Sequence, residues 1–178
     1  ESKAICIALD DPHYLGVLSS RPHMLWTAKR GSRHGVGNDF TYNNLAIFQT
    51  FPFPAATADQ QTRIRQLGEA LDAHRKKQQA LHPKLTITAM YNVLERLRAG
   101  APLDAKDKQV HDQALVSVLR QLHDDLDAAV FDAYGWHDQP DQQTILARLV
   151  ALNTRRRAEE AAGTIRWLRP EFQNPNAQ

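Results

Sequence analysis

The residues best suited to chemistry lie in the first quarter of the chain. Residues 21–37 contain four basic side chains and no acidic one, so this segment has a formal charge of +4. Guanidinium and ammonium groups bind phosphates, while amide and imidazole groups can also reach the edges of bases. We therefore expect contact with nucleic acid here, and the candidate residues are Arg21, Lys29, Arg30, Arg33, His34, Asn38, Asn43 and Asn44.

Asn43 and Asn44 are candidates for reading bases, because a carboxamide can pair bidentately with adenine. A second interpretation stays open, since asparagine is also favoured in turns, where its side chain bonds to the nearby backbone.

Charge alone does not choose between a phosphate-binding segment and an ordinary exposed loop. The 178 residues carry a net charge of only +2.

The charge is strongly segregated along the sequence. Residues 61–98 carry eight basic and three acidic side chains, whereas residues 99–143 carry three basic and nine acidic ones. Charge runs of this kind are typical of solvated helix faces. The candidates for tracking a phosphate backbone are Arg63, Arg65, Arg75, Lys76 and Lys77, and a plain solvated face explains them equally well.

No catalytic constellation is recognisable. The eight histidines are scattered and none has the spacing of a metal-binding helix motif. Gly35 and Gly37 form only part of a glycine-rich loop, and the lone Cys6 excludes an internal disulfide. We assign no catalytic, cofactor-binding or metal-ligating residue, and we expect a binding or support module.

Residues 1–58 predict a small mixed α+β segment. Ala4 to Leu9 is typical of a short buried strand, and two helices are predicted at 13–19 and from 20 to about 30, ended by Gly31. Residues 31–38 predict a glycine-rich loop, and residues 40–54, rich in aromatics, predict an extended segment.

Residues 59–178 predict a helical domain. Apolar residues recur at helical spacing in four stretches, about 59–81, 86–98, 104–134 and 140–162, with glycine or proline at their ends. Such stripes are stable when they bury one another. The expected fold is therefore mainly α, a helical bundle or helical hairpin array preceded by the mixed α+β segment. The expected domains are 1–58 and 59–178.

Four stretches resemble one family in the same order along the chain. They are Leu15–Trp26 (LGVLSSRPHMLW), Tyr42–Pro54 (YNNLAIFQTFPFP), Leu122–Gly135 (LHDDLDAAVFDAYG) and Leu152–Gln173 (LNTRRRAEEAAGTIRWLRPEFQ). They are similar to the target-recognition region and C-terminal signature of MmeI-like, type IIL, DNA adenine methyltransferases. Those enzymes belong to restriction-modification systems and have relatives in phage defence.

The resemblance implies a parent enzyme that transfers a methyl group from S-adenosylmethionine to adenine N6. Its cofactor loop and Asn-Pro-Pro-aromatic motif would lie upstream of this chain, which begins with Glu1 rather than Met. We therefore expect a C-terminal part of a longer polypeptide, comprising the end of the target-recognition domain and a helical domain. The implied partners are double-stranded DNA and the upstream methyltransferase domain.

Two other interpretations stay open. The chain could be a helical protein-interaction module of a defence complex, without DNA contact, or a small enzyme whose site is unrecognised. No apolar run is long enough to cross a bilayer and no secretory leader is visible, so we expect a cytoplasmic protein.

Overall fold

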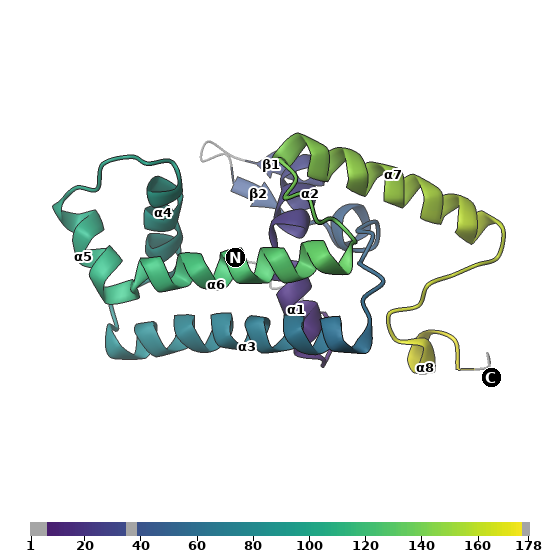
Figure 1. Ribbon diagram of the computed structural model, residues 1–178, viewed down its shortest axis with the longest axis horizontal. Coiled ribbons are helices and arrows are strands. Elements are labelled where there is room, and N and C mark those ends of the chain that lie inside the picture. Colours follow the sequence, from purple (N-terminus) through teal and green to yellow (C-terminus); the bar gives the residue numbers. More distant parts are fainter. Residues whose placement is uncertain (1–6, 35–38, 176–178) are drawn as a thin grey trace. The chain divides into compact units, whose positions relative to one another are not determined.

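The chain folds into helices and one short pair of strands (Figure 1). The computed structural model describes residues 7–34 and 39–175. These residues form two compact units, each assembled from segments that are separate in sequence. Unit 1 contains the described residues of 1–11, 21–54 and 138–178. Unit 2 contains residues 12–20 and 55–137.

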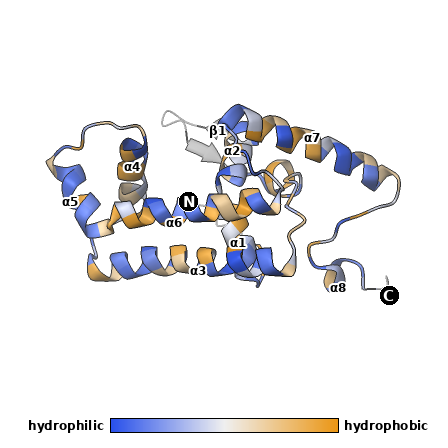
Figure 2. Ribbon diagram, in the orientation of Figure 1, coloured by the Kyte–Doolittle hydropathy of each residue, from blue (hydrophilic) through white to orange (hydrophobic). Residues whose placement is uncertain are grey.

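Unit 2 is a group of five helices. They are α1 (Pro12–Ser19), α3 (Ala58–Leu81), α4 (Ile87–Arg98), α5 (Ala105–Ala114) and α6 (Val116–Ala133). The two long helices α3 and α6 run side by side in opposite directions, and α4 and α5 pack on each other and on α6. Figure 2 shows hydrophobic and hydrophilic residues alternating along α3 and α6. The apolar faces form a core that includes Ile64, Leu71, Met90, Leu94, Leu119 and Leu126.

Side-chain caps begin the helices of unit 2 where the sequence predicts starts. Thr57 and Gln60 form a reciprocal capping box at α3, in which each side chain accepts a hydrogen bond from the other's backbone N–H. Thr86 caps α4 and Asp104 caps α5 in the same manner. Each cap satisfies a backbone N–H that the helix itself leaves without a partner.

Unit 1 surrounds an aromatic core. Its elements are α2 (Arg21–Arg30), β1 (Ser32–His34), β2 (Asp39–Thr41), the π-helix η1 (Asn44–Phe48), α7 (Gln142–Ala161) and α8 (Pro170–Gln173). Helix α2 packs against both η1 and α7. The buried side chains include Trp26, Ile47, Phe51, Phe53, Ile145 and Leu149.

The mainly α class is confirmed, but the small mixed α+β segment predicted for residues 1–58 is not supported, because its elements are divided between the two units. Within the described ranges, the strands are three residues each, and β1 pairs with β2 in an antiparallel register that sets Arg33 opposite Phe40. The predicted strand Ala4–Leu9 lies partly outside the described residues, and Ile7 to Leu9 are not in a strand. Residues 32–34 form β1 rather than a loop, because they find pairing partners in 39–41.

Residues 40–54, expected to be extended, contain the π-helix η1 instead. Asn43 caps its first turn, so the backbone groups of η1 bond locally, whereas Phe40 and Thr41 at the start of the stretch pair with β1.

The single helix predicted over residues 104–134 is also wrong, because Leu115 divides it into α5 and α6. Leu115 has φ 47° and ψ 55°, the left-handed conformation that ends a right-handed helix. His74 bonds through Nε2 to the carbonyl oxygen of Ala114 at 2.9 Å, which satisfies an acceptor released by the break. The periodic apolar pattern continues across the break, so the sequence carries no signal for it.

The compact units interleave along the chain, whereas the sequence suggested two consecutive regions divided at 58/59. The chain passes between units close to that boundary, at 54/55, and also at 11/12, 20/21 and 137/138. Helix α1 therefore packs with α3, and α7 packs with α2. None of the helices in the described part of the chain is both long enough and apolar enough to span a membrane.

Candidate nucleic-acid interface

The C-terminal end of α2 presents two predicted cations to solvent. Lys29 and Arg30 occupy the last turn and both side chains are exposed. The helix ends where the N–H of Gly31 donates to the carbonyl of Thr27 at 2.7 Å. Cations stabilise a helix C-terminus, which gives this pair a structural benefit as well. Neither side chain forms an ion pair within residues 7–34 and 39–175.

Arg30 is held in place although it is exposed. Its Nε donates a hydrogen bond to the carbonyl oxygen of Ala46 at 3.2 Å, and its guanidinium carbon lies 5.2 Å from the centre of the Trp26 ring. These contacts orient the guanidinium without neutralising its charge. An oriented cation loses little side-chain entropy on binding an anion, so Arg30 is well prepared for a phosphate.

The π-helix η1 forms the second part of the candidate interface. Asn43 is its N-cap, and the Asn43 side chain accepts a hydrogen bond from the N–H of Ala46 at 3.1 Å. In this structure Asn43 therefore has the role expected of an asparagine in a turn, in which the side chain bonds to the nearby backbone. Asn44 is exposed, and its backbone carbonyl accepts from the N–H of Gln49 at 3.0 Å. π-helical turns are rare and occur often at functional sites.

Buried side chains hold η1 against the rest of unit 1. The indole Nε1 of Trp26 donates to the carbonyl of Ile47 at 3.2 Å, and Thr50 Oγ1 donates to the carbonyl of Ala46 at 2.6 Å. From α7, the amide of Asn153 donates to the carbonyl of Thr50 at 2.7 Å. The turn that presents Asn44 is therefore fixed by residues far away in sequence.

An aromatic cluster lies beneath these groups. The His23 ring contacts Phe51 with ring centres 4.9 Å apart, and its Nε2 lies 3.1 Å from the hydroxyl of Tyr42. Burial raises the pKa of Tyr42 above its ordinary value of 10. His23, Trp26 and Phe51 are at most 5% exposed, so these rings pack in the core of unit 1.

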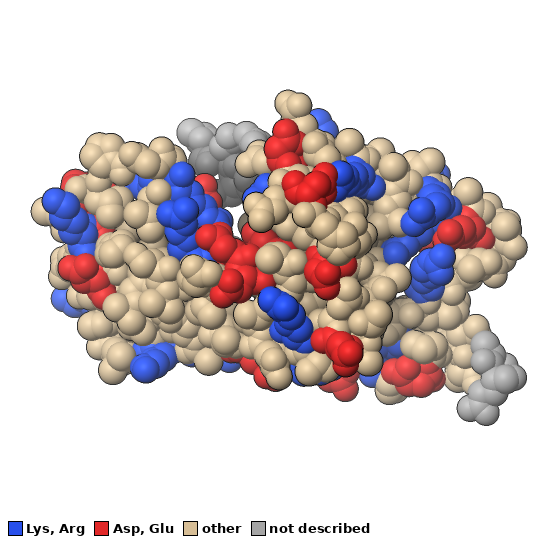
Figure 3. Space-filling model, in the orientation of Figure 1, with Lys and Arg blue, Asp and Glu red and all other residues tan. Residues whose placement is uncertain are grey.

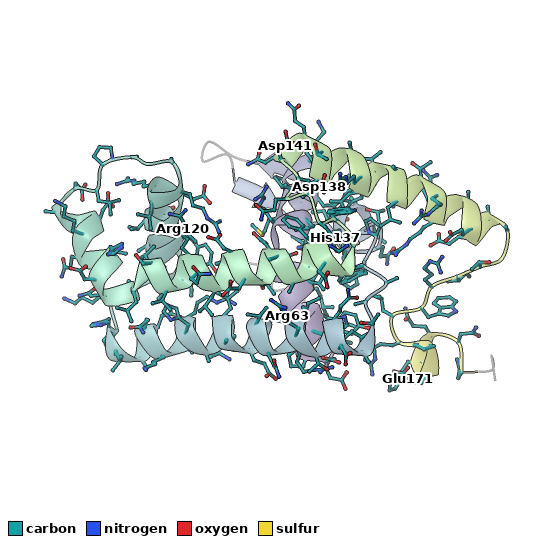
Figure 4. The ribbon with its side chains drawn as sticks, viewed as in Figure 1. Arg63, Arg120, His137, Asp138, Asp141 and Glu171 are labelled. Atoms are coloured by element: carbon teal, nitrogen blue, oxygen red, sulfur yellow. The ribbon has the colours of Figure 1, made fainter. Side chains whose placement is uncertain are left out.

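Arg21 lies at the other end of α2 and is engaged within unit 1. Its Nη2 donates to the carbonyl oxygen of Pro140 at 3.1 Å. Figure 4 shows Asp138 and Asp141 at the beginning of α7, on either side of Pro140 in sequence. Asp141 caps α7, and the hydrogen bonds from Thr144 followed by the charge of Arg21 lower the pKa of its carboxyl group. The structure therefore places Arg21 in the joint between α2 and α7.

Two further predicted residues lie in the first strand of the antiparallel pair. Arg33 and His34 are in β1, and His34 lies opposite Asp39 in the register. Asn38 lies outside the described residues. Of the eight predicted contact residues, the structure joins Arg30 and Asn43 through Ala46, which bonds to both, and Lys29 and Asn44 are their exposed neighbours in sequence.

A buried polar network in unit 2 was missed by the sequence reasoning. Tyr91 of α4 donates its hydroxyl hydrogen to His123 Nε2 of α6 at 2.7 Å, and Arg75 of α3 donates to the same hydroxyl oxygen at 3.2 Å. Burial, aided by the charges of Arg98 and Arg75, lowers the pKa of His123 to about 4. The imidazole is therefore neutral at pH 7 and joins three helices as a hydrogen-bond acceptor.

Elsewhere, charges of both signs are mixed. Figure 3 shows basic and acidic side chains interspersed over α4 and α5 and over α7. Asp124 of α6 accepts from Arg98 at 3.0 Å and pairs with Arg120 at 3.6 Å. Within the described ranges, no group of three or more His, Cys, Asp or Glu side chains is arranged to hold a metal ion.

The fold is similar to part of a solved restriction-modification enzyme. Among solved structures, the chain is similar to the type IIL restriction-modification enzyme MmeI, determined in complex with DNA, with a TM-score of 0.59 and 20% sequence identity. The similarity covers 83% of this chain and 16% of MmeI, so the chain spans about one sixth of that enzyme. No protein-family model and no curated protein matches the sequence. At this identity the similarity establishes an MmeI-like fold and leaves the role of the chain to be proposed.

Proposed function

We propose that this chain binds duplex DNA as part of a larger enzyme similar to the type IIL restriction-modification enzymes. The observation that carries the proposal is the fold, which is shared over 83% of the chain with an enzyme determined in complex with DNA. The exposed cations Lys29 and Arg30 support it, because they lie beside η1 with no carboxylate paired to them in the described residues.

The chemistry of the α2–η1 surface suits a phosphate backbone. Each Lys or Arg that neutralises a phosphate releases condensed counterions, so such contacts supply a large part of DNA affinity. Lys29 acts as a mobile point charge, whereas Arg30 is oriented by Ala46 and Trp26. Asn44 is the exposed carboxamide on the same surface and is the better placed of the two asparagines to read a base edge.

We assign catalysis to polypeptide outside this chain. Methyl transfer to adenine N6 requires the base to be extruded from the duplex, and the protein must grip the duplex during that step. In this proposal the chain provides part of the grip and of target recognition in a restriction-modification or phage-defence system. S-adenosylmethionine would be held by the upstream domain, because the sequence here contains no complete glycine-rich loop for it.

The experiment that tests the proposal is a titration of a fluorescein-labelled duplex with this chain, followed by anisotropy at several salt concentrations. The proposal predicts binding whose logarithm of affinity falls linearly with the logarithm of salt concentration. Absence of binding at low salt contradicts it.

A protein-interaction role is the second candidate, favoured by exposed apolar side chains on unit 2. Leu81, Leu115 and Val118 are 60%, 47% and 47% exposed, although apolar residues are normally buried. This alternative predicts concentration-dependent self-association in sedimentation experiments, together with no binding to duplex DNA.

A further inference from the structure

The most exposed apolar side chain of the candidate interface is Leu45, the second residue of η1. It is 68% exposed, whereas Ile47, two residues later in the same π-helix, is fully buried. The turn therefore has an inner side that packs in unit 1 and an outer side that presents a leucine to solvent. The core of unit 1 therefore does not account for a leucine at this position, because its side chain is not packed there.

The backbone around Leu45 is fixed, although its side chain is not packed. The next carbonyl group, that of Ala46, accepts hydrogen bonds from Arg30 Nε at 3.2 Å and from Thr50 Oγ1 at 2.6 Å. The N–H of Ala46 donates to the Asn43 side chain at 3.1 Å. A leucine carried on a rigid turn can be driven into a narrow space without the turn yielding.

The surroundings of Leu45 indicate what it meets. Asn43, Asn44 and Gln49 are exposed and polar, and the oriented guanidinium of Arg30 bonds to the residue after Leu45. A protein-docking surface would require a contiguous apolar patch, which these polar neighbours interrupt. One apolar side chain that lies between a cation and carboxamides suits a partner with a charged backbone and an apolar interior. Duplex DNA is such a partner, because its phosphates are charged and its stacked bases are apolar.

We propose that Leu45 is a wedge that inserts between two stacked base pairs while Lys29 and Arg30 hold the flanking phosphates. Leucine is among the side chains that proteins insert at base steps, and pyrimidine–purine steps such as TA are the easiest to unstack. This inference rests on the proposed DNA-binding function. The proposed function names residues that contact the surface of the duplex, and this inference adds one residue that deforms the duplex.

The test uses duplexes that carry 2-aminopurine in a TA step and a fluorescein label at one end. The fluorescence of 2-aminopurine is quenched by stacking, so it reports the insertion, while the anisotropy of the label reports binding in the same titration. We expect the wild-type chain to raise the 2-aminopurine fluorescence. We expect Leu45→Ala to lose more than half of that rise with an unchanged salt slope, and Leu45→Met to retain it.

The matched control is Met24→Ala, which removes another exposed apolar side chain of unit 1, 58% exposed, and should leave both signals unchanged. Circular dichroism verifies that each variant is folded. Duplex binding without a rise in 2-aminopurine fluorescence, or a rise that Leu45→Ala does not reduce, overturns the wedge and leaves the proposed function standing. Absence of duplex binding overturns the proposed function and the wedge with it.

Discussion

Gly16 of α1 and Gly68 of α3 lie against each other, so closely that a Cβ atom on Gly68 would be 3.0 Å from the Cα atom of Gly16. A Cβ atom on Gly16 would be only 2.6 Å from Cγ2 of Ile64 and 2.8 Å from its carbonyl oxygen. The two glycines therefore permit a short helix to lie directly on a long one. This contact explains why residues 12–20 pack with α3 although some forty residues separate them in sequence.

Replacing Gly16 by Ala should destabilise unit 2. Alanine favours the helix by about 1 kcal/mol, but forcing a methyl group into a well-packed contact costs about 1–3 kcal/mol, and here the near atoms include backbone. We therefore expect a net loss of stability in urea unfolding. The control is Leu15→Ala on the same helix, where the side chain is 41% exposed and a smaller effect is expected. A Gly16→Ala protein as stable as the wild type would show that α1 does not pack in this way.

The buried histidine predicts a pH dependence of stability. The pKa of His123 is lowered to about 4 in the folded chain, against 6.5 ordinarily. Between these pH values the unfolded state binds a proton that the folded state does not. The stability contributed by neutral His123 is therefore present above pH 6.5 and is lost as pH falls towards 4, by up to about 3 kcal/mol.

Replacing His123 tests whether this histidine causes the pH dependence of stability. His123→Gln keeps a group that can accept from Tyr91, so the free energy of unfolding should depend less steeply on pH between 6.5 and 4 than in the wild type. His137→Gln changes a histidine whose side chain is 74% exposed and should leave the slope unaltered. Equal slopes in His123→Gln and wild type would mean that His123 titrates normally.

The left-handed residue between α5 and α6 gives a third prediction. Leu115 pays about 1 kcal/mol or more for its positive φ, and glycine adopts this conformation without strain. Leu115→Gly should therefore stabilise the chain or leave it unchanged. Val118→Gly, at a helical position that is equally exposed at 47%, should destabilise it by about 1 kcal/mol. Thermal unfolding compares the two, and equal losses would argue for a continuous helix.

Asn43 gives a fourth prediction, because it is the cap that orders η1. Asn43→Ala removes the bond to the N–H of Ala46 and should cost about 1 kcal/mol of stability. Asn44→Ala should leave stability nearly unchanged, since that side chain is exposed. The pair is compared by urea unfolding. A larger loss for Asn44→Ala would reverse the roles that we assign to the two asparagines.

Local signals in the sequence predict much of the helical structure. The helix predicted over 86–98 begins after its N-cap Thr86, and Met90 and Leu94 are buried as their spacing indicates. The break at Leu115 is different, because leucine favours helix and nothing local marks the change. Likewise, η1 depends on hydrogen bonds from Trp26 and Asn153, which approach it only in the folded chain.

The candidate site was predictable in composition but not in geometry. The basic segment identifies Lys29 and Arg30, and both are exposed. The engagement of Arg21 with Pro140 could not be foreseen, since 119 residues separate them. Leu45 was overlooked because a leucine in an apolar stretch is normally assigned to the core, and only its 68% exposure distinguishes it.

The central claim is that the α2–η1 surface binds the phosphates of duplex DNA. Its most direct test compares the salt dependence of duplex binding for Lys29→Gln/Arg30→Gln with that of Lys106→Gln/Lys108→Gln, a matched pair of exposed lysines on α5. Our account predicts that the first variant binds more weakly, with the slope of log affinity against log salt flatter by about two. The second variant should keep the wild-type slope. Equal slopes in the wild type and in Lys29→Gln/Arg30→Gln would contradict the account.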